Sequence, residues 1–258
     1  MDSTASPVSG ETYWERATSP IASLIFVLPL LAVYEGGVLL LGGEAMRNGV
    51  DVWLREALEQ IAFGQYTLRP AATCGRLLAS PHASRCMWSV SGRLLAAMTL
   101  EAALLAALLF AGALALARWL PAEHPELHAP SRTTSAESAA PPAFNSPARA
   151  KVARMIAYCG AGLYEELLFR LMLLPAAALV LHTVWGSRQG SLLAAAVVSS
   201  ALFALAHHLP GGEPWIWQRA VFRWSAGMVF SALFLLRGYG VAAVSHAGYD
   251  LLVACAEP

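Results

Sequence analysis

Two adjacent glutamates and an arginine, Glu165, Glu166 and Arg170, lie inside an otherwise apolar stretch, residues 155–181. An ionisable residue at the centre of a bilayer helix costs about 2.5–3.5 kcal/mol on insertion scales, against about 0.3–0.6 kcal/mol gained per Leu, Ile, Phe or Val. Three such groups facing lipid would cancel most of that gain. We therefore expect them to face a protein interior or a wet cavity, where intramembrane charge indicates a functional site.

The spacing of these residues suggests different roles for the two glutamates. At about 100° per residue, Glu166 and Arg170 lie roughly 40° apart on one helix face, close enough for an ion pair, whereas Glu165 is rotated about 100° away from Glu166. The pair would keep Glu166 ionised and fixed, which leaves Glu165 freer to act as a general base. The alternative is a purely structural buried ion cluster.

Two further polar motifs lie in later apolar segments. Phe203 and His207 are four residues apart, so a packed aromatic ring could direct the imidazole inward. His246 and Asp250 have the same spacing, and an Asp at that position can orient the His ring or join it as a metal ligand. Each motif alone is a weak signal, because a His at the end of a span is usually structural or interfacial.

These motifs need helices to position them, and six apolar segments could supply such helices. About 20 residues at 1.5 Å each cross a hydrocarbon core of roughly 30 Å. The last segment is short for a full span, which indicates packing inside a bundle. We therefore predict an all-α, multi-pass transmembrane helical bundle. The six segments are residues 20–41, 94–120, 155–181, 192–209, 220–236 and 241–254.

Residues 50–61 have a different pattern, with apolar residues at helical spacing on one face and charged residues on the other. The segment is too short and too polar to span, so we predict an amphipathic helix in the membrane interface. Packing against a neighbouring helix is the alternative. The apolar positions are Val50, Trp53, Leu54, Ala57, Leu58 and Ile61.

Composition divides the chain into three regions. Residues 1–120 hold two spans and the amphipathic helix, with a predicted loop at 64–91. Residues 121–147, rich in Pro, Ser, Ala and Thr, are expected to form an exposed, disordered linker, and residues 148–258 a four-helix core that carries all three motifs. Glu35, near the end of the first span, is expected close to the interface; a contribution to the active cavity is the alternative.

Overall composition supports the membrane class. Hydrophobic residues make up 57% of the chain and charged residues 13%, whereas soluble domains have about 45–50% apolar and about 25% charged residues. The formal net charge is zero, so nothing supports nucleic acid as a partner. We expect an integral, multi-pass protein of a bacterial cell membrane, whose partners are the lipid bilayer and a protein or peptide substrate.

The motifs occur in the order E-E-x-x-x-R, F-x-x-x-H and H-x-x-x-D, each inside its own hydrophobic segment. This order resembles the CPBP family of intramembrane proteases, which includes the CAAX prenyl endopeptidases and the bacteriocin-processing and immunity-associated membrane proteins. The resemblance covers about residues 148–256, and the N-terminal third has no motif to match. It implies a helical bundle with an active site buried below the membrane surface.

The resemblance also implies roles for individual residues. Glu165 would be the general base, His207 its partner on the catalytic water, and His246 the donor that stabilises the oxyanion. Glu166 and Arg170 would form a supporting pair, with the Phe203 ring aiming the second motif.

One position departs from the prenyl endopeptidases, which have Asn where this chain has Asp250. An ionised Asp accepts hydrogen bonds but cannot donate one to an oxyanion. Asp250 must therefore be protonated, orient His246, or bind a metal. We expect it to orient His246, because a carboxylate beside an imidazole favours the charged, donating ring.

We therefore predict a membrane endopeptidase that hydrolyses a peptide bond at or within the bilayer. Glu165, His207 and His246 should converge, since each is costly alone in hydrocarbon. The cofactor is open: these residues could bind a catalytic divalent metal such as zinc, with water as fourth ligand, or form a metal-free, glutamate-activated water site. Alternatives from other classes are a non-proteolytic membrane scaffold or immunity-type protein and, third, a proton-coupled transporter.

Overall fold

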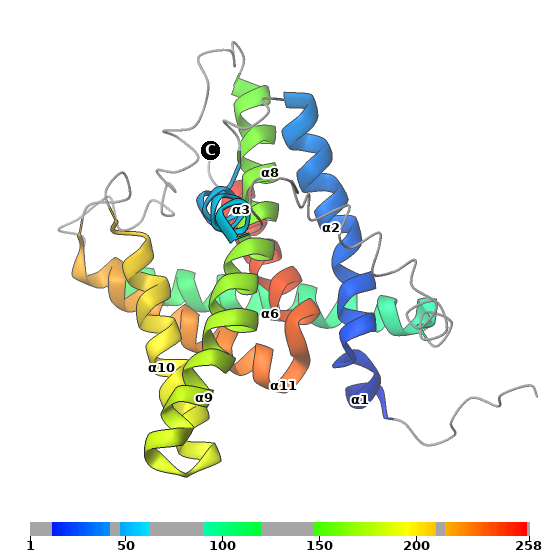
Figure 1. Ribbon diagram of the computed structural model, residues 1–258. Helices are drawn as coiled ribbons and strands as arrows, with labels where there is room; N and C mark the ends of the chain where they lie inside the picture. The colour runs from blue at the N-terminus through cyan, green and yellow to red at the C-terminus, as the bar shows by residue number, and fades with distance from the viewer. Residues whose placement is uncertain (1–11, 42–46, 62–89, 120–146, 210–214, 257–258) are drawn as a thin grey trace, which may run out of the picture.

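Helices make up all the regular secondary structure in the part of the chain that the computed structural model describes (Figure 1). That part comprises residues 12–41, 47–61, 90–119, 147–209 and 215–256. The elements are α1 (Tyr13–Ala17), α2 (Pro20–Leu41), α3 (Gly49–Ile61), α6 (Gly92–Trp119), α8 (Pro147–Glu166), the π-helical turn η3 (Leu167–Leu173), α9 (Leu174–Trp185), α10 (Arg188–Ala206) and α11 (Trp217–Ala256).

Five helical stretches are long and apolar enough to cross a membrane. They span residues 20–41, 92–116, 148–185, 188–206 and 217–256, so the predicted all-α, multi-pass bundle is confirmed. Two of the six predicted segments, 220–236 and 241–254, both belong to α11. A kink at Gly238 separates them, with φ 79° and ψ 176°. A residue with a Cβ rarely adopts this positive φ, so glycine permits the bend.

The first motif lies at a change of helix type. α8, η3 and α9 follow one another as one bent rod over residues 148–185 (Figure 1). In η3 the Leu174 N–H bonds to the Phe169 carbonyl five residues back, and Ser199 Oγ on α10 donates to the same carbonyl at 2.5 Å. Pro175, at the start of α9, has no N–H to continue a regular ladder, which favours a local break before it. Single π turns of this kind are frequent at functional sites.

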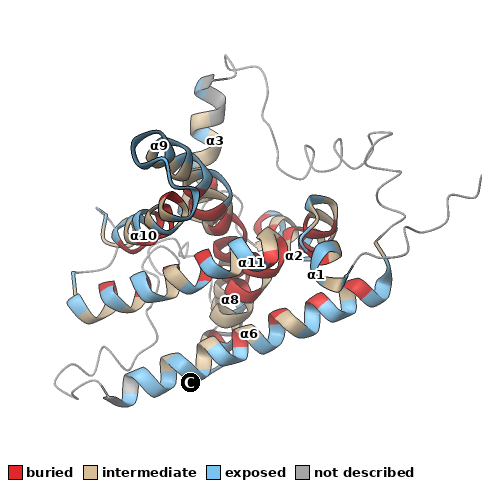
Figure 2. Cartoon of the chain, turned by 90° about the horizontal axis from the view of Figure 1, so that it is seen from below, coloured by how far each residue is buried: buried red, intermediate tan, exposed pale blue. Residues whose placement is uncertain are grey.

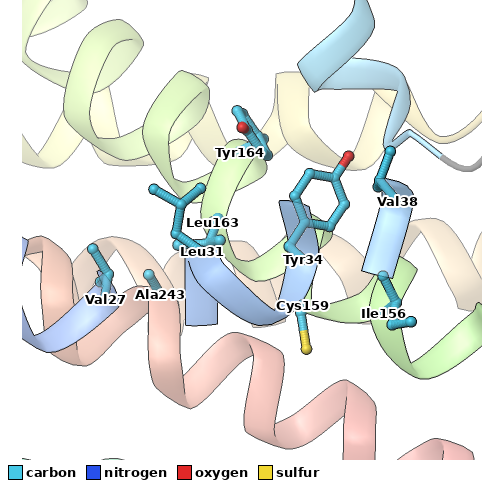
Figure 3. Packing of buried hydrophobic residues seen from close by; sticks show 9 residues of the cluster. All are labelled: Val27, Leu31, Tyr34, Val38, Ile156, Cys159, Leu163, Tyr164 and Ala243. Carbon is cyan, nitrogen blue, oxygen red and sulfur yellow. The ribbon is translucent and has the colours of Figure 1, made fainter. Parts of the chain in front are cut away.

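A buried apolar cluster joins the N-terminal helix α2 to the helices that carry the motifs. Figure 3 shows that it includes residues from α2, α8 and α11. Burying these side chains stabilises the contact at about 25 cal/mol per Å² of apolar surface. The N-terminal region is therefore packed onto the core that holds the motifs. The buried residues are Val27, Leu31, Tyr34, Val38, Ile156, Cys159, Leu163, Tyr164 and Ala243.

Small residues let α11 approach its neighbours closely. A Cβ on Gly162 of α8 would lie 2.6 Å from the Ala247 backbone nitrogen, and one on Gly227 of α11 would lie 2.9 Å from Ser200 Cβ on α10. Helix contacts in membranes depend on such small residues, because lipid tails are as apolar as the side chains and close packing must drive association. The helices that carry the three motifs are thus held tightly against one another.

For residues 50–61, packing against a neighbouring helix is the alternative to a position in the membrane interface. The amphipathic helix α3 does pack against its neighbours. Val50 and Leu54 pack on the buried cluster, and Asp51 is fully buried. Trp53 remains 54% exposed.

The outer surfaces of the long helices are apolar. In Figure 2 the buried residues concentrate where the helices meet, whereas much of α6 and α9 is exposed. Such continuous apolar exposure is rare on soluble monomers and is expected where helices face lipid. The exposed positions include Leu40, Leu108, Val184 and Leu236.

Two predictions fall almost entirely on residues that the structure does not describe. Only the last two positions of the predicted loop at 64–91 are among the described residues. Of the predicted linker at 121–147, only Pro147, the first residue of α8, is described. The division of the chain into three regions therefore stays a prediction.

Candidate active site

The two adjacent glutamates at the end of α8 have different surroundings. Glu166 is fully buried, and its Oε1 lies 3.0 Å from Nη1 of the equally buried Arg170. The ion pair predicted from their spacing is therefore present. Glu165 keeps 12% of its side chain exposed, and its Oε2 lies 4.0 Å from Nε2 of His207.

Aromatic rings surround the Arg170 guanidinium. Its Cζ lies 4.4 Å from the centroid of the Phe203 ring and 5.6 Å from that of Phe230, and its Nη2 donates to the Gly227 carbonyl at 3.3 Å. Cation–π attraction is strongest for a desolvated cation, so these rings offset part of the cost of burying the charge.

His246 has a closer carboxylate partner than its sequence neighbour. Its Nδ1 lies 2.8 Å from Glu166 Oε1, whereas its Nε2 lies 3.6 Å from Asp250 Oδ2. Phe230 stacks on the imidazole at 4.4 Å with 19° between the planes. The i, i+4 spacing predicted Asp250 as the orienting group; Glu166, 80 positions away, makes the short hydrogen bond.

The orientation of His207 follows from its backbone contact. Its Nδ1 lies 2.9 Å from the Phe203 carbonyl oxygen, which can only accept, so Nδ1 carries the hydrogen. In the neutral ring Nε2 is then an acceptor. This acceptor faces the Glu165 carboxylate across the 4.0 Å gap, which is too long for a direct hydrogen bond.

The three motifs come together around the Phe203 ring. Its centroid lies 5.0 Å from that of His207 and 6.0 Å from that of His246, and the Arg170 guanidinium lies over its face. Glu165 joins the group through His207. The structure therefore brings His207 and His246 to the same aromatic ring and Glu165 beside His207, and their convergence on one cavity stays a prediction.

A three-ligand zinc site does not fit this arrangement. Both ring nitrogens of His246 have a carboxylate nearby, Glu166 at 2.8 Å from Nδ1 and Asp250 at 3.6 Å from Nε2. Among the described residues, no group of three or more His, Cys, Asp or Glu side chains could hold a metal ion. We therefore derive no step of the reaction through a metal.

One residue at the site was missed by the sequence reasoning, which found no motif in the N-terminal third. Asn48, immediately before α3, donates from Nδ2 to Glu165 Oε1 at 3.3 Å. An Asn just ahead of an amphipathic pattern is a signal for a helix start. That signal could have located the N-cap, but not its contact with a residue 117 positions away.

A network of charges lies beside Asn48. The buried Asp51 carboxylate accepts from Tyr34 Oη at 2.9 Å, from Arg47 Nη1 at 2.8 Å and from Arg55 Nε at 2.7 Å. Burial alone would lower the pKa of Arg47, but hydrogen bonds with Asp51 and Glu35 outweigh it and raise that pKa above its ordinary value. Both arginines therefore stay charged.

Glu35 belongs to the same network. Its carboxylate lies 3.2 Å from Arg55 Nη2 and 3.3 Å from Arg47 Nη2, and it accepts from Tyr164 Oη at 3.1 Å. Tyr164 directly precedes Glu165 in α8. Glu35 therefore lies in the charge network beside the site, and its contribution to the active cavity stays a prediction.

The three motifs and their order also correspond to a known family. Residues 148–252 match the family model for type II CAAX prenyl endopeptidase Rce1-like proteins. No match was found among curated proteins or among solved structures. The matched range runs from α8 to near the end of α11 and leaves out α2, α3 and α6. The part of the chain that carries Glu165, His207 and His246 is thus similar to the type II CAAX prenyl endopeptidases, which supports the resemblance to the CPBP family of intramembrane proteases.

Proposed function

We propose that the protein is an intramembrane endopeptidase that hydrolyses a peptide bond in a membrane-associated protein or peptide, with a water molecule activated by Glu165. The observation that carries this proposal is the 4.0 Å gap between Glu165 Oε2 and His207 Nε2. Glu165 lies within, and His207 directly follows, helical stretches that are long and apolar enough to span the bilayer. The expected substrate therefore reaches the site from the membrane.

The gap between Glu165 and His207 suits one water. Two acceptors cannot bond each other, but a water about 2.8 Å from each would subtend about 90° at its oxygen, close to its own H–O–H angle. It would donate one hydrogen to each acceptor and keep its lone pairs free to attack a carbonyl carbon. Glu165 would take the proton that the water loses and return it to the leaving amine as the C–N bond breaks.

His246 would donate a hydrogen bond to the oxyanion that forms when water attacks the peptide carbonyl. Glu166 accepts from Nδ1, so a protonated ring offers Nε2–H as a second donor. Stacking on Phe230 holds the plane of the imidazole. Asp250, 3.6 Å from Nε2, balances the positive ring without donating to substrate.

The test is cleavage of a peptide library by the purified protein in liposomes, with products identified by mass spectrometry. Glu165→Gln should lower the rate about 10²–10⁴-fold, the range lost with a general base. Glu56→Gln, the same change on an exposed residue of α3, is the matched control and should cleave at the wild-type rate. Hydrolysis in ¹⁸O-water should place one heavy oxygen in the new carboxyl terminus.

A Glu165→Gln protein that cleaves at the wild-type rate would contradict the proposal. The paired carboxylates would then be structural, and the non-proteolytic scaffold would explain the polar cluster better. Loss of activity on treatment with a chelator, with recovery on adding zinc, would contradict the metal-free mechanism alone.

A further inference from the structure

We infer that Asn48, which lies outside the family match, is a positioning residue for the base Glu165 and aligns its carboxylate toward His207. The inference rests on the proposed function of Glu165. It makes the N-terminal region part of the active site, because the residues matched by the family model do not include this donor.

The orientation of the Asn48 amide is determined by its position at the start of α3. The side-chain Oδ1 accepts from the Val50 N–H at 2.9 Å, and the backbone carbonyl oxygen of Asn48 accepts from the Val52 N–H at 3.1 Å. A backbone N–H can only donate, so the atom facing Val50 must be the oxygen. The Nδ2 donor is therefore the atom 3.3 Å from Glu165 Oε1.

Tyr34 holds the backbone of Asn48 in place. The Asn48 N–H donates to Tyr34 Oη at 2.8 Å, and that hydroxyl donates to Asp51 Oδ2 at 2.9 Å. Tyr34 is fully buried, and its ring lies where a Cβ on Gly160 would be. Tyr34 of α2 thus contacts the start of α3 through its hydroxyl group and α8 through its ring, five residues before Glu165.

The charges around Asp51 fix the first turn of α3. Asp51 bonds Arg47 and Arg55, and Glu35 contacts the same two arginines, so two positive charges face two carboxylates. A paired network of this kind is rigid because every member loses a partner if one moves. The Asn48 donor is therefore held at a defined place relative to α8.

The consequence for Glu165 is that its two oxygens have different partners. Oε1 accepts from Asn48, which leaves Oε2 facing His207 across the gap proposed for water. Misplacing a catalytic group by about 1 Å can cost 10²-fold in rate. Loss of the Asn48 donor should therefore lower the turnover number with little effect on substrate binding.

Two variants remove the donor but keep the helix cap, since Ser and Asp are N-caps comparable with Asn. In liposomes, Asn48→Ser should lower kcat about tenfold and Asn48→Asp, which adds a like charge beside Glu165, about a hundredfold. KM should stay within about twofold. Ser187→Asp, a substitution at the exposed N-cap of α10, is the matched control and should leave kcat unchanged. Unchanged kcat in both Asn48 variants would overturn the inference.

A second measurement does not depend on activity. Thermal unfolding in detergent is compared for Asn48→Ser, Glu165→Ala and the double variant. If the two side chains bond, the Asn48 change should lower Tm in the wild-type background and have little further effect once the Glu165 acceptor is gone. Additive changes in Tm would overturn the inference. Wild-type activity in Glu165→Gln would instead contradict the proposed function, so the two failures are distinguishable.

Discussion

The site has two halves that differ in their contact with solvent. In the closed half, Glu166 and Arg170 are fully buried and the His246 side chain is 6% exposed. In the open half, Glu165 is 12% and His207 19% exposed. The two glutamates are neighbours in sequence. The rotation of about 100° between consecutive residues of a helix places one of them in each half. The same residue type therefore has different surroundings at two successive positions, which is the basis for proposing different roles for them.

The halves also differ in how their polar groups are paired. Glu166 Oε1 lies within 3.0 Å of both Arg170 Nη1 and His246 Nδ1. Glu165 accepts from Asn48, and its other carboxylate oxygen lies 4.0 Å from His207 Nε2. The ionisable groups of the closed half thus contact one another directly, whereas Glu165 and His207 in the open half lie too far apart for a direct hydrogen bond.

The largest effects on cleavage and on Tm should come from replacing each of the two glutamates in turn with glutamine. Glu165→Gln should lower cleavage about 10²–10⁴-fold, because an amide cannot take a proton from water, and should leave Tm nearly unchanged. Glu166→Gln should lower Tm strongly, because it leaves Arg170 and His246 buried beside a neutral group. Cleavage and thermal unfolding are measured on both proteins. Equal losses of Tm would remove the distinction between the halves.

The next effect concerns the closed half alone. Arg170→Ala should cost about 3–5 kcal/mol of unfolding free energy, since it leaves the Glu166 carboxylate buried without its cation. Arg188→Ala, at the exposed start of α10, should change it by less than about 0.5 kcal/mol. Denaturant unfolding in detergent micelles gives both values. If the two variants are equally stable, Arg170 does not support the site.

Contacts between residues close in sequence could be predicted from the sequence, whereas contacts between residues far apart in sequence could not. The Glu166–Arg170 pair was predictable because helical periodicity alone brings i and i+4 together. The bond from Glu166 to His246 joins residues 80 positions apart, and the one from Asn48 to Glu165 residues 117 apart. Such contacts depend on how the helices pack, which no single-segment pattern encodes. The spans were predictable from apolar length, whereas the continuity of α11 through Gly238 was not, because glycine is equally compatible with a loop.

Asp250 should have an intermediate effect. Because Glu166 already holds His246 Nδ1 and Asp250 lies 3.6 Å from Nε2, Asp250→Asn should keep activity at about a tenth of the wild-type rate. Asparagine still accepts through its carbonyl oxygen, and it is the residue found in the prenyl endopeptidases. Peptide cleavage with and without added zinc is the measurement. Complete loss of activity, restored by zinc, would instead make Asp250 a metal ligand.

The smallest expected effects are those of two glycine-to-alanine substitutions, which separate the contribution of close packing to stability from that of helix propensity. Alanine favours a helix over glycine by about 0.5–1 kcal/mol, so Gly112→Ala on α6, where a Cβ meets nothing within 4 Å, should be neutral or slightly stabilising. Gly160→Ala gains the same propensity but pushes its Cβ into the Tyr34 ring, and overpacking costs about 1–3 kcal/mol. Tm should therefore fall only for Gly160→Ala. Because Tyr34 holds Asn48, kcat should also fall a few-fold while KM stays constant. A lower Tm with unchanged kcat would mean that the Tyr34 ring supports the bundle without positioning Glu165.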